Sequence, residues 1–192
     1  MAAADADHLD EIQEIRFRVR VEIDGRVGVD REWTWSPVTG QVTRTVDGQS
    51  LTFVFGQPAD EAQRDADAQF VNDSLWFCPP MHVSWAGSDL TVTDRGTTAL
   101  PIGEGEAHEV TLQYAPSGGG YTPGDAYDLF LGPDDRIVAW NYRQGGATTP
   151  TKTTTFDDYV TAGPLHIATE HRSKDGRFDL ATDHVVVTLR NR

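Results

Sequence analysis

The chain has 192 residues, of which 38% are hydrophobic and 24% charged, and its formal net charge is −14. This length suits one domain with a single core, and the many aromatic and branched aliphatic side chains exclude an intrinsically disordered chain. The sequence has no run of 18 apolar residues, which excludes a transmembrane helix. The acidic balance argues against nucleic-acid binding, because phosphate contacts require Lys and Arg.

The charged residues are divided unequally between the residue types that carry each charge. Asp outnumbers Glu by 21 to 9, and Arg outnumbers Lys by 14 to 2. An acidic, Lys-poor surface of this kind is typical of proteins from salt-loving organisms, where it keeps the surface hydrated while salt screens the charges. Because the acids are spread over most of the chain, we favour this halophilic interpretation. Attraction of a cationic partner or ion is the alternative.

Residues 1–14 form an acidic N-terminal segment, for which we predict at most a short helix from Asp7 to Glu14. The first five residues have neither the basic region nor the apolar core of a signal peptide. Two locations therefore stay open. The protein is extracytoplasmic, in the periplasm or cell envelope, if a signal peptide has been trimmed, and cytoplasmic if Met1 is the natural start.

The chain from residue 15 onward is predicted to be one domain built mainly of strands. Apolar and charged residues alternate over 15–23, which is typical of a strand with one buried face. Asp24-Gly25 and Asp47-Gly48 are hairpin signals. They predict two hairpins, with partner strands over 26–35, 41–46 and 49–55.

One segment breaks this pattern and predicts a helix over about 58–71. Pro58 suits a first helical position, and Asp60 and Glu61 suit the first turn. Three alanines and Phe70 then recur at helical spacing. We expect the sequence Asn-Asp-Ser at 72–74 to end this helix.

Short strands separated by Gly, Pro and Asp turns follow, and no helices alternate with them. We predict these strands over 82–85, 90–94, 106–114, 126–131, 136–143, 151–156, 165–171 and 177–189. The predicted fold is therefore mainly β (α+β). It is a large curved antiparallel sheet that forms an unclosed β-barrel of ten to twelve strands, capped by one or two helices. Residues 15–192 form this single half-barrel domain.

Three segments, in this order, resemble a known superfamily. They are residues 72–82 (NDSLWFCPPMH), residues 127–143 (YDLFLGPDDRIVAWNYR), and residues 154–159 (TTFDDY) followed by Gly163 and residues 165–168 (LHIA). Together they are similar to uncharacterised bacterial envelope proteins related to the lipoprotein carriers LolA and LolB and to the mycobacterial lipoprotein LppX. The likeness covers roughly residues 15–190. It implies an unclosed β-barrel around a cavity for acyl chains, and a carrier or lipid sensor rather than an enzyme.

The aromatic residues are the strongest candidates for a ligand site. Several of them, together with the alanine face of the helix, are expected to line or to fill the interior of the barrel. The cavity candidates are Trp33, Trp35, Phe53, Phe55, Phe70, Trp76, Trp85, Trp140 and Tyr142.

Catalytic and metal-binding patterns are weak in this sequence. The six histidines show no helical pair of the kind that binds zinc, and His166 and His171 are an odd number of residues apart, which places them on opposite faces of one strand. Asp134-Asp135 and Asp157-Asp158 are interpreted as turn residues. The single cysteine, Cys78, excludes an internal disulfide and is expected to be a buried structural thiol. We therefore name no catalytic residue, no metal ligand and no cofactor.

Three functions stay open at this point. The first is non-enzymatic binding of a hydrophobic small molecule, a lipid or an acyl chain, in the barrel interior. The second is a hydrolase or metal-dependent enzyme that uses His and Asp at the barrel mouth. The third is a structural or interaction protein whose core is filled. Nucleic acid is not expected as a partner of any of them, and the sequence does not indicate the oligomeric state.

Overall fold

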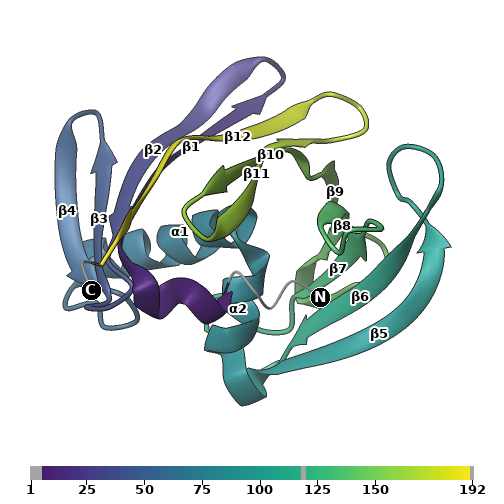
Figure 1. Cartoon of the computed structure of the whole chain (residues 1–192), viewed down its shortest axis with the longest axis horizontal. Coiled ribbons are helices and arrows are strands. Elements are labelled where there is room, and N and C mark those ends of the chain that lie inside the picture. The colour runs from purple at the N-terminus through teal and green to yellow at the C-terminus, as the bar shows by residue number, and fades with distance from the viewer. Residues whose placement is uncertain (1–5, 118–119, 191–192) are drawn as a thin grey trace.

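The computed structural model describes residues 6–117 and 120–190. These residues form two curved antiparallel sheets, of seven and five strands, which bend around a central helix without closing on each other (Figure 1). The predicted fold class is confirmed. The one large sheet expected from the sequence is divided into two, because strand pairing is interrupted in two places: between β4 and β5, where the helices intervene, and between β9 and β10.

The seven-stranded sheet contains both ends of the described chain. Its strand order is β10-β11-β12-β1-β2-β3-β4, so the first and last strands of the sequence are neighbours. The strands are β1 (Ile12–Ile23), β2 (Arg26–Trp35), β3 (Gln41–Val46), β4 (Gln49–Val54), β10 (Asp157–Ala162), β11 (Leu165–Arg172) and β12 (Phe178–Leu189). The alternation predicted for β1 is observed: Ile15, Phe17 and Val19 are buried, and Phe17 pairs with Trp33 of β2.

The five-stranded sheet is a simple meander in which each strand pairs with the next. Its strands are β5 (Leu90–Ala99), β6 (Glu106–Tyr114), β7 (Ala126–Leu131), β8 (Ile137–Arg143) and β9 (Lys152–Thr155). The central strand β7 is buried along its whole length. Among the described residues, the two sheets are joined by one β-bridge, between Thr154 of β9 and Ser173, which directly follows β11. The edge strands β4 and β5 do not pair with each other, so the barrel is not closed there.

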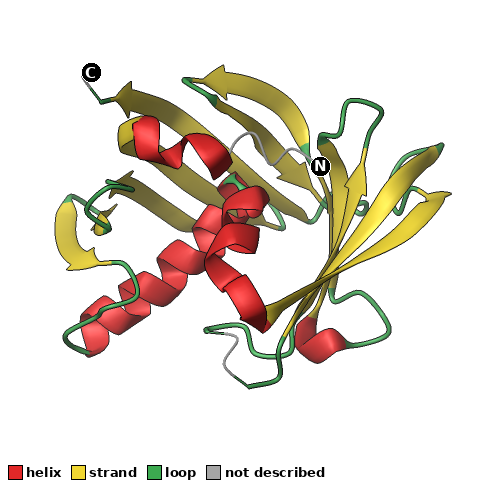
Figure 2. Ribbon diagram, turned by 60° about the horizontal axis from the view of Figure 1, so that its bottom comes forward, coloured by secondary structure: helices red, strands yellow, loops and turns green. Residues whose placement is uncertain are grey.

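Helix α1 (Glu61–Phe77) lies in the space between the two sheets, as Figures 1 and 2 show from two directions. It begins later than predicted because Asp60 is the N-cap, whose carboxylate accepts a hydrogen bond from the Gln63 amide. It also extends beyond 71, so the predicted end at 72–74 is wrong. The Asp73 side chain bonds to Arg31 and Trp33 of β2 instead of competing for the helix backbone.

A second helix, α2 (Pro79–Ala86), takes the place of the strand predicted over 82–85. Cys78 ends α1 with a non-helical backbone, as expected for a residue that precedes a proline. Pro79 and Pro80 then occupy the first turn of α2, where proline's missing N–H has no helical partner to lose. The alternation of four residues was too short to distinguish a strand from one turn of helix.

Two further segments differ from the sequence predictions. The strand β10 forms where turn residues were expected at Asp157-Asp158, and Asp158 has a left-handed backbone with φ of 52°. At the N-terminus the described residues form a 3₁₀ helix, η1 (Ala6–Glu11), and β1 begins at Ile12, so the predicted helix over 7–14 is shorter than expected. Residues 1–5 of the acidic segment lie outside the described residues. Two other 3₁₀ turns are η2 (Gly87–Asp89) and η3 (Gln144–Gly146).

The core is built around the inner face of α1. Phe70 of this helix is fully buried and its ring packs at 5.4 Å from Trp33 and 5.6 Å from Trp35, measured between ring centroids. At the end of α1, Phe77 stacks on Phe17 of β1 at 4.4 Å. The helix therefore packs into the seven-stranded sheet through Phe70 and Phe77, and cavities remain on either side of its C-terminal part.

Candidate functional site

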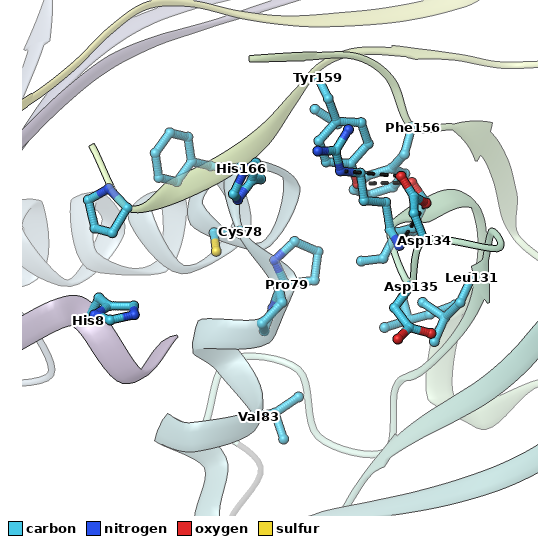
Figure 3. A pocket seen from close by; sticks show the side chains of 17 residues that line it. His8, Cys78, Pro79, Val83, Leu131, Asp134, Asp135, Phe156, Tyr159 and His166 are labelled. Atoms are coloured by element: carbon cyan, nitrogen blue, oxygen red, sulfur yellow. Dashed lines mark hydrogen bonds and ion pairs between the residues drawn. The ribbon is translucent and has the colours of Figure 1, made fainter. Parts of the chain in front are cut away.

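A cavity of about 430 Å³ opens where α1 ends and α2 begins (Figure 3). Its walls come from both helices, from η1, from the β7–β8 hairpin and from β10 and β11. Most of the lining side chains are apolar or aromatic. The lining residues are His8, Phe77, Cys78, Pro79, Pro80, Val83, Leu129, Leu131, Asp134, Asp135, Arg136, Ile137, Phe156, Tyr159, Pro164, His166 and Ala168.

Local sequence features explain these walls. The prolines at 79–80 form the first turn of α2, and Val83 of the same helix faces the cavity (Figure 3). Leu129 and Leu131 are two residues apart on β7, so strand geometry places both on the same face of the sheet. The intervening Phe130 faces the other way, into a small separate cluster with Ala107 and Ala139.

Charged groups lie at one end of the cavity, around the turn between β7 and β8, whereas His8 and His166 border it on the other side (Figure 3). The Arg136 guanidinium is 3.5 Å from the Asp134 carboxylate and stands 5.3 Å from the centre of the Tyr159 ring. The Tyr159 hydroxyl donates a hydrogen bond of 2.9 Å to the Ile137 carbonyl oxygen, and burial raises the pKa of this tyrosine well above its usual range. Tyr159 is therefore a neutral wall residue. Arg136 is the fixed positive charge at this end.

The nine aromatic residues predicted to line a cavity fall into three groups. Four of them are buried in the core around α1 and border none of the three cavities of about 430, 280 and 290 Å³: Trp33, Trp35, Phe53 and Phe70. Phe55 and Trp85 border a cavity of about 280 Å³ beside α2. Trp76, Trp140 and Tyr142 border another, of about 290 Å³, between the two sheets. A ligand contact for any of the nine stays a prediction.

The lining of the 430 Å³ cavity was not among the predicted site residues, yet the sequence contained a signal for it. All three segments that carry the resemblance contribute to its wall. Phe77 comes from the first, Leu129 and Ile137 from the second, and Phe156 and Ala168 from the third. The three segments that carry the resemblance are far apart in the sequence and thus meet around one cavity.

A buried serine–histidine pair connects the two helices. The Ser74 hydroxyl is 3.0 Å from Nε2 of His82 and also donates to the Val71 carbonyl oxygen at 3.2 Å. Burial lowers the pKa of His82 to about 3, so this ring is neutral near pH 7. Ser74 is 1% exposed and borders none of the cavities described, which favours a structural role for the pair over nucleophilic catalysis.

The histidines of β11 point in opposite directions, as the spacing predicted: His171 is completely buried and His166 is exposed. Within residues 6–117 and 120–190, no group of three or more His, Cys, Asp or Glu side chains is arranged to hold a metal ion. In the same part of the chain, no helix has the length and apolar character needed to cross a bilayer. Cys78 is buried, as expected.

Comparison with known proteins adds a likeness in structure only. No protein-family model matches the chain, and no curated protein matches it in sequence. Five solved chains match in structure. One of them is the crystal structure of a DUF1329 family protein from Desulfovibrio piger ATCC 29098, with a TM-score of 0.52 and 9% sequence identity over 99% of this chain and 92% of that one. The two proteins therefore share a fold over almost their whole lengths.

Proposed function

We propose that the protein binds a hydrophobic ligand, a lipid or an acyl chain, in the 430 Å³ cavity, and that it acts as a carrier or sensor rather than as an enzyme. The observation that carries this proposal is the apolar lining of the cavity between the helices and the β7–β8 hairpin. Its volume falls within the range of roughly 300–1,000 Å³ that is typical of small-molecule sites. The resemblance of the lining segments to the LolA, LolB and LppX proteins supports the same class of ligand.

The energetics favour a chain-like apolar ligand. Each buried methylene contributes about 0.8 kcal/mol, so about ten of them supply on the order of 8 kcal/mol. This is roughly the free energy of micromolar binding, before the cost of immobilising the ligand is subtracted. Arg136 at the polar end of the cavity offers a charged contact for a head group, although Asp134 competes for it at 3.5 Å.

Binding is tested first on the unmodified protein. Native mass spectrometry of gently purified protein is expected to show a bound lipid-sized mass, and a fluorescent fatty acid is expected to bind saturably. The absence of both a co-purified mass and saturable binding would refute the proposal and favour a filled, structural core.

Replacing Val83 by tryptophan is expected to weaken fatty-acid binding by at least about tenfold. Val83 is half-buried on α2 and faces the cavity, so the larger indole occupies ligand volume without replacing a fully buried core residue. Fluorescence titration measures the effect. Val92→Trp is the matched control, because Val92 of β5 is 45% exposed and does not border the cavity. Equal affinities of V83W and the wild-type protein would place the ligand elsewhere.

A further inference from the structure

The cavity of about 290 Å³ between the sheets differs from the 430 Å³ cavity in the chemistry of its walls. It lies on the other side of the C-terminal part of α1, where Trp76 borders it while the next residue, Phe77, borders the 430 Å³ cavity. Its aromatic walls come from both sheets and from α1. They are Trp76, Tyr127, Trp140, Tyr142 and Phe178.

Two cationic side chains border this aromatic cavity. Lys152 begins β9 directly opposite Tyr142 of β8, and its ammonium stands 3.3 Å from the centre of the Phe178 ring on β12. It thus reaches from one sheet to the other. Arg31 of β2 borders the same cavity, and its Nε and Nη2 atoms each donate a 2.9 Å hydrogen bond to Asp73.

Lys152 is distinctive because its charge is not matched by an acid. No described carboxylate lies within ion-pair distance of its ammonium, although the chain carries 30 acidic residues. The side chain is half-buried, and burial lowers the pKa of its ammonium. The one acid that borders the cavity, Asp125, is occupied by the Tyr142 hydroxyl at 2.9 Å and the Gly145 amide at 2.7 Å. A partly desolvated ammonium without a counter-charge is costly, and an entering anion relieves that cost.

We infer that this cavity is a second ligand site, which binds a small planar anion such as an aromatic carboxylate. The carboxylate pairs with the Lys152 ammonium, and the ring packs against the aromatic walls, where edge-to-face and offset contacts are favourable. The site is independent of the proposed lipid site, because the two cavities share no lining residue.

The test uses two probes of the same shape, 2-naphthoate and its neutral analogue 2-naphthamide, and measures binding to the full-length protein by calorimetry at neutral pH and low ionic strength. The carboxylate is expected to bind about tenfold more tightly than the amide. Lys152→Met is expected to remove this preference and Lys152→Arg to retain most of it. Lys174→Met is the matched control, because Lys174 is the only other lysine and is exposed.

Three results would overturn the inference. They are equal affinities of the two probes for the wild-type protein, the absence of binding of either probe, and a carboxylate preference that survives in folded K152M. A fatty-acid titration of K152M separates this site from the other one. Fatty-acid binding is expected to be unchanged in K152M, whereas V83W is expected to weaken it and to retain naphthoate binding.

Discussion

Replacing Asp73 by alanine is expected to lower the free energy of unfolding by about 3–5 kcal/mol. The Asp73 carboxylate is completely buried and accepts two hydrogen bonds from Arg31 and one from the Trp33 indole, all at 2.9 Å. The variant leaves Arg31, which is 15% exposed, with a nearly buried charge and no partner. It also leaves the Trp33 N–H unsatisfied and removes a link between α1 and β2. For a domain of this size the midpoint of thermal unfolding is expected to fall by roughly 10 °C.

Asp30→Ala is the control for this experiment. Asp30 makes a similar two-point contact with Arg18, at 2.7 and 2.5 Å, but its side chain is 44% exposed. Because solvent screens an exposed ion pair, D30A is expected to cost less than about 1 kcal/mol. Urea unfolding and thermal unfolding of both variants measure the difference. Similar losses in D73A and D30A would show that burial does not determine the strength of these pairs.

Acidification is expected to destabilise the protein strongly between pH 6.5 and pH 3. Burial lowers the pKa of both His82 and His171 from 6.5 to about 3. Below pH 6.5 these two histidines therefore take up protons in the unfolded chain but not in the folded chain. The stability that the two neutral histidines contribute is complete above pH 6.5 and is lost as the pH falls. Over the whole window the loss for the two histidines together is on the order of several kcal/mol, a large part of the stability of a domain.

The structure explains why neither ring accepts a proton readily. The His171 ring lies 4.3 Å from Phe156 and 5.3 Å from Trp76, and its Nε2 atom is buried with no partner among the described residues. His82 is buried between Ser74 and Trp85.

The measurement is the free energy of urea unfolding as a function of pH. Above pH 5, most carboxylates stay ionised. In this range the free energy of unfolding is expected to change less steeply with pH in His82→Gln and in His171→Leu than in the wild-type protein, whatever the absolute stability of each variant. His108→Gln serves as the control, because the His108 side chain is 45% exposed. An unchanged slope in both variants would contradict the conclusion that the buried His82 and His171 cause the loss of stability in acid.

Regular alternation and turn residues predicted most of the strands. The segment 15–23 alternates clearly, the segments 26–35 and 41–46 are bounded by turn residues, and β1, β2 and β3 form there. Asp24 and Asp47 have the left-handed backbone that their Asp-Gly turns require. The predictions failed where a pattern was too short, as in α2, or where tertiary hydrogen bonds outweighed local preference, as at Asp73 in α1.

The candidate sites were less predictable than the fold. The sequence marked aromatic residues, but it did not distinguish those that fill the core, such as Trp33 and Phe70, from those that border a cavity, such as Trp140. It also gave no sign that some acids are buried. Asp67, Asp73, Asp125 and Asp128 are all buried, with at most 7% of each residue exposed, while the general acidity indicated a solvated surface. Burial of an acid depends on a partner distant in sequence, and such partners become visible only after folding.

The sequence by itself determined a mainly β fold around one helix, because the period of the apolar residues and the turn chemistry are local properties of the chain. The tertiary structure decided how the strands are divided between sheets and which residues border the cavities. It divided the strands into two sheets, brought the three resembling segments together around the 430 Å³ cavity, and placed Lys152 across from Phe178. These features depend on contacts between residues far apart in the chain, which no local pattern specifies.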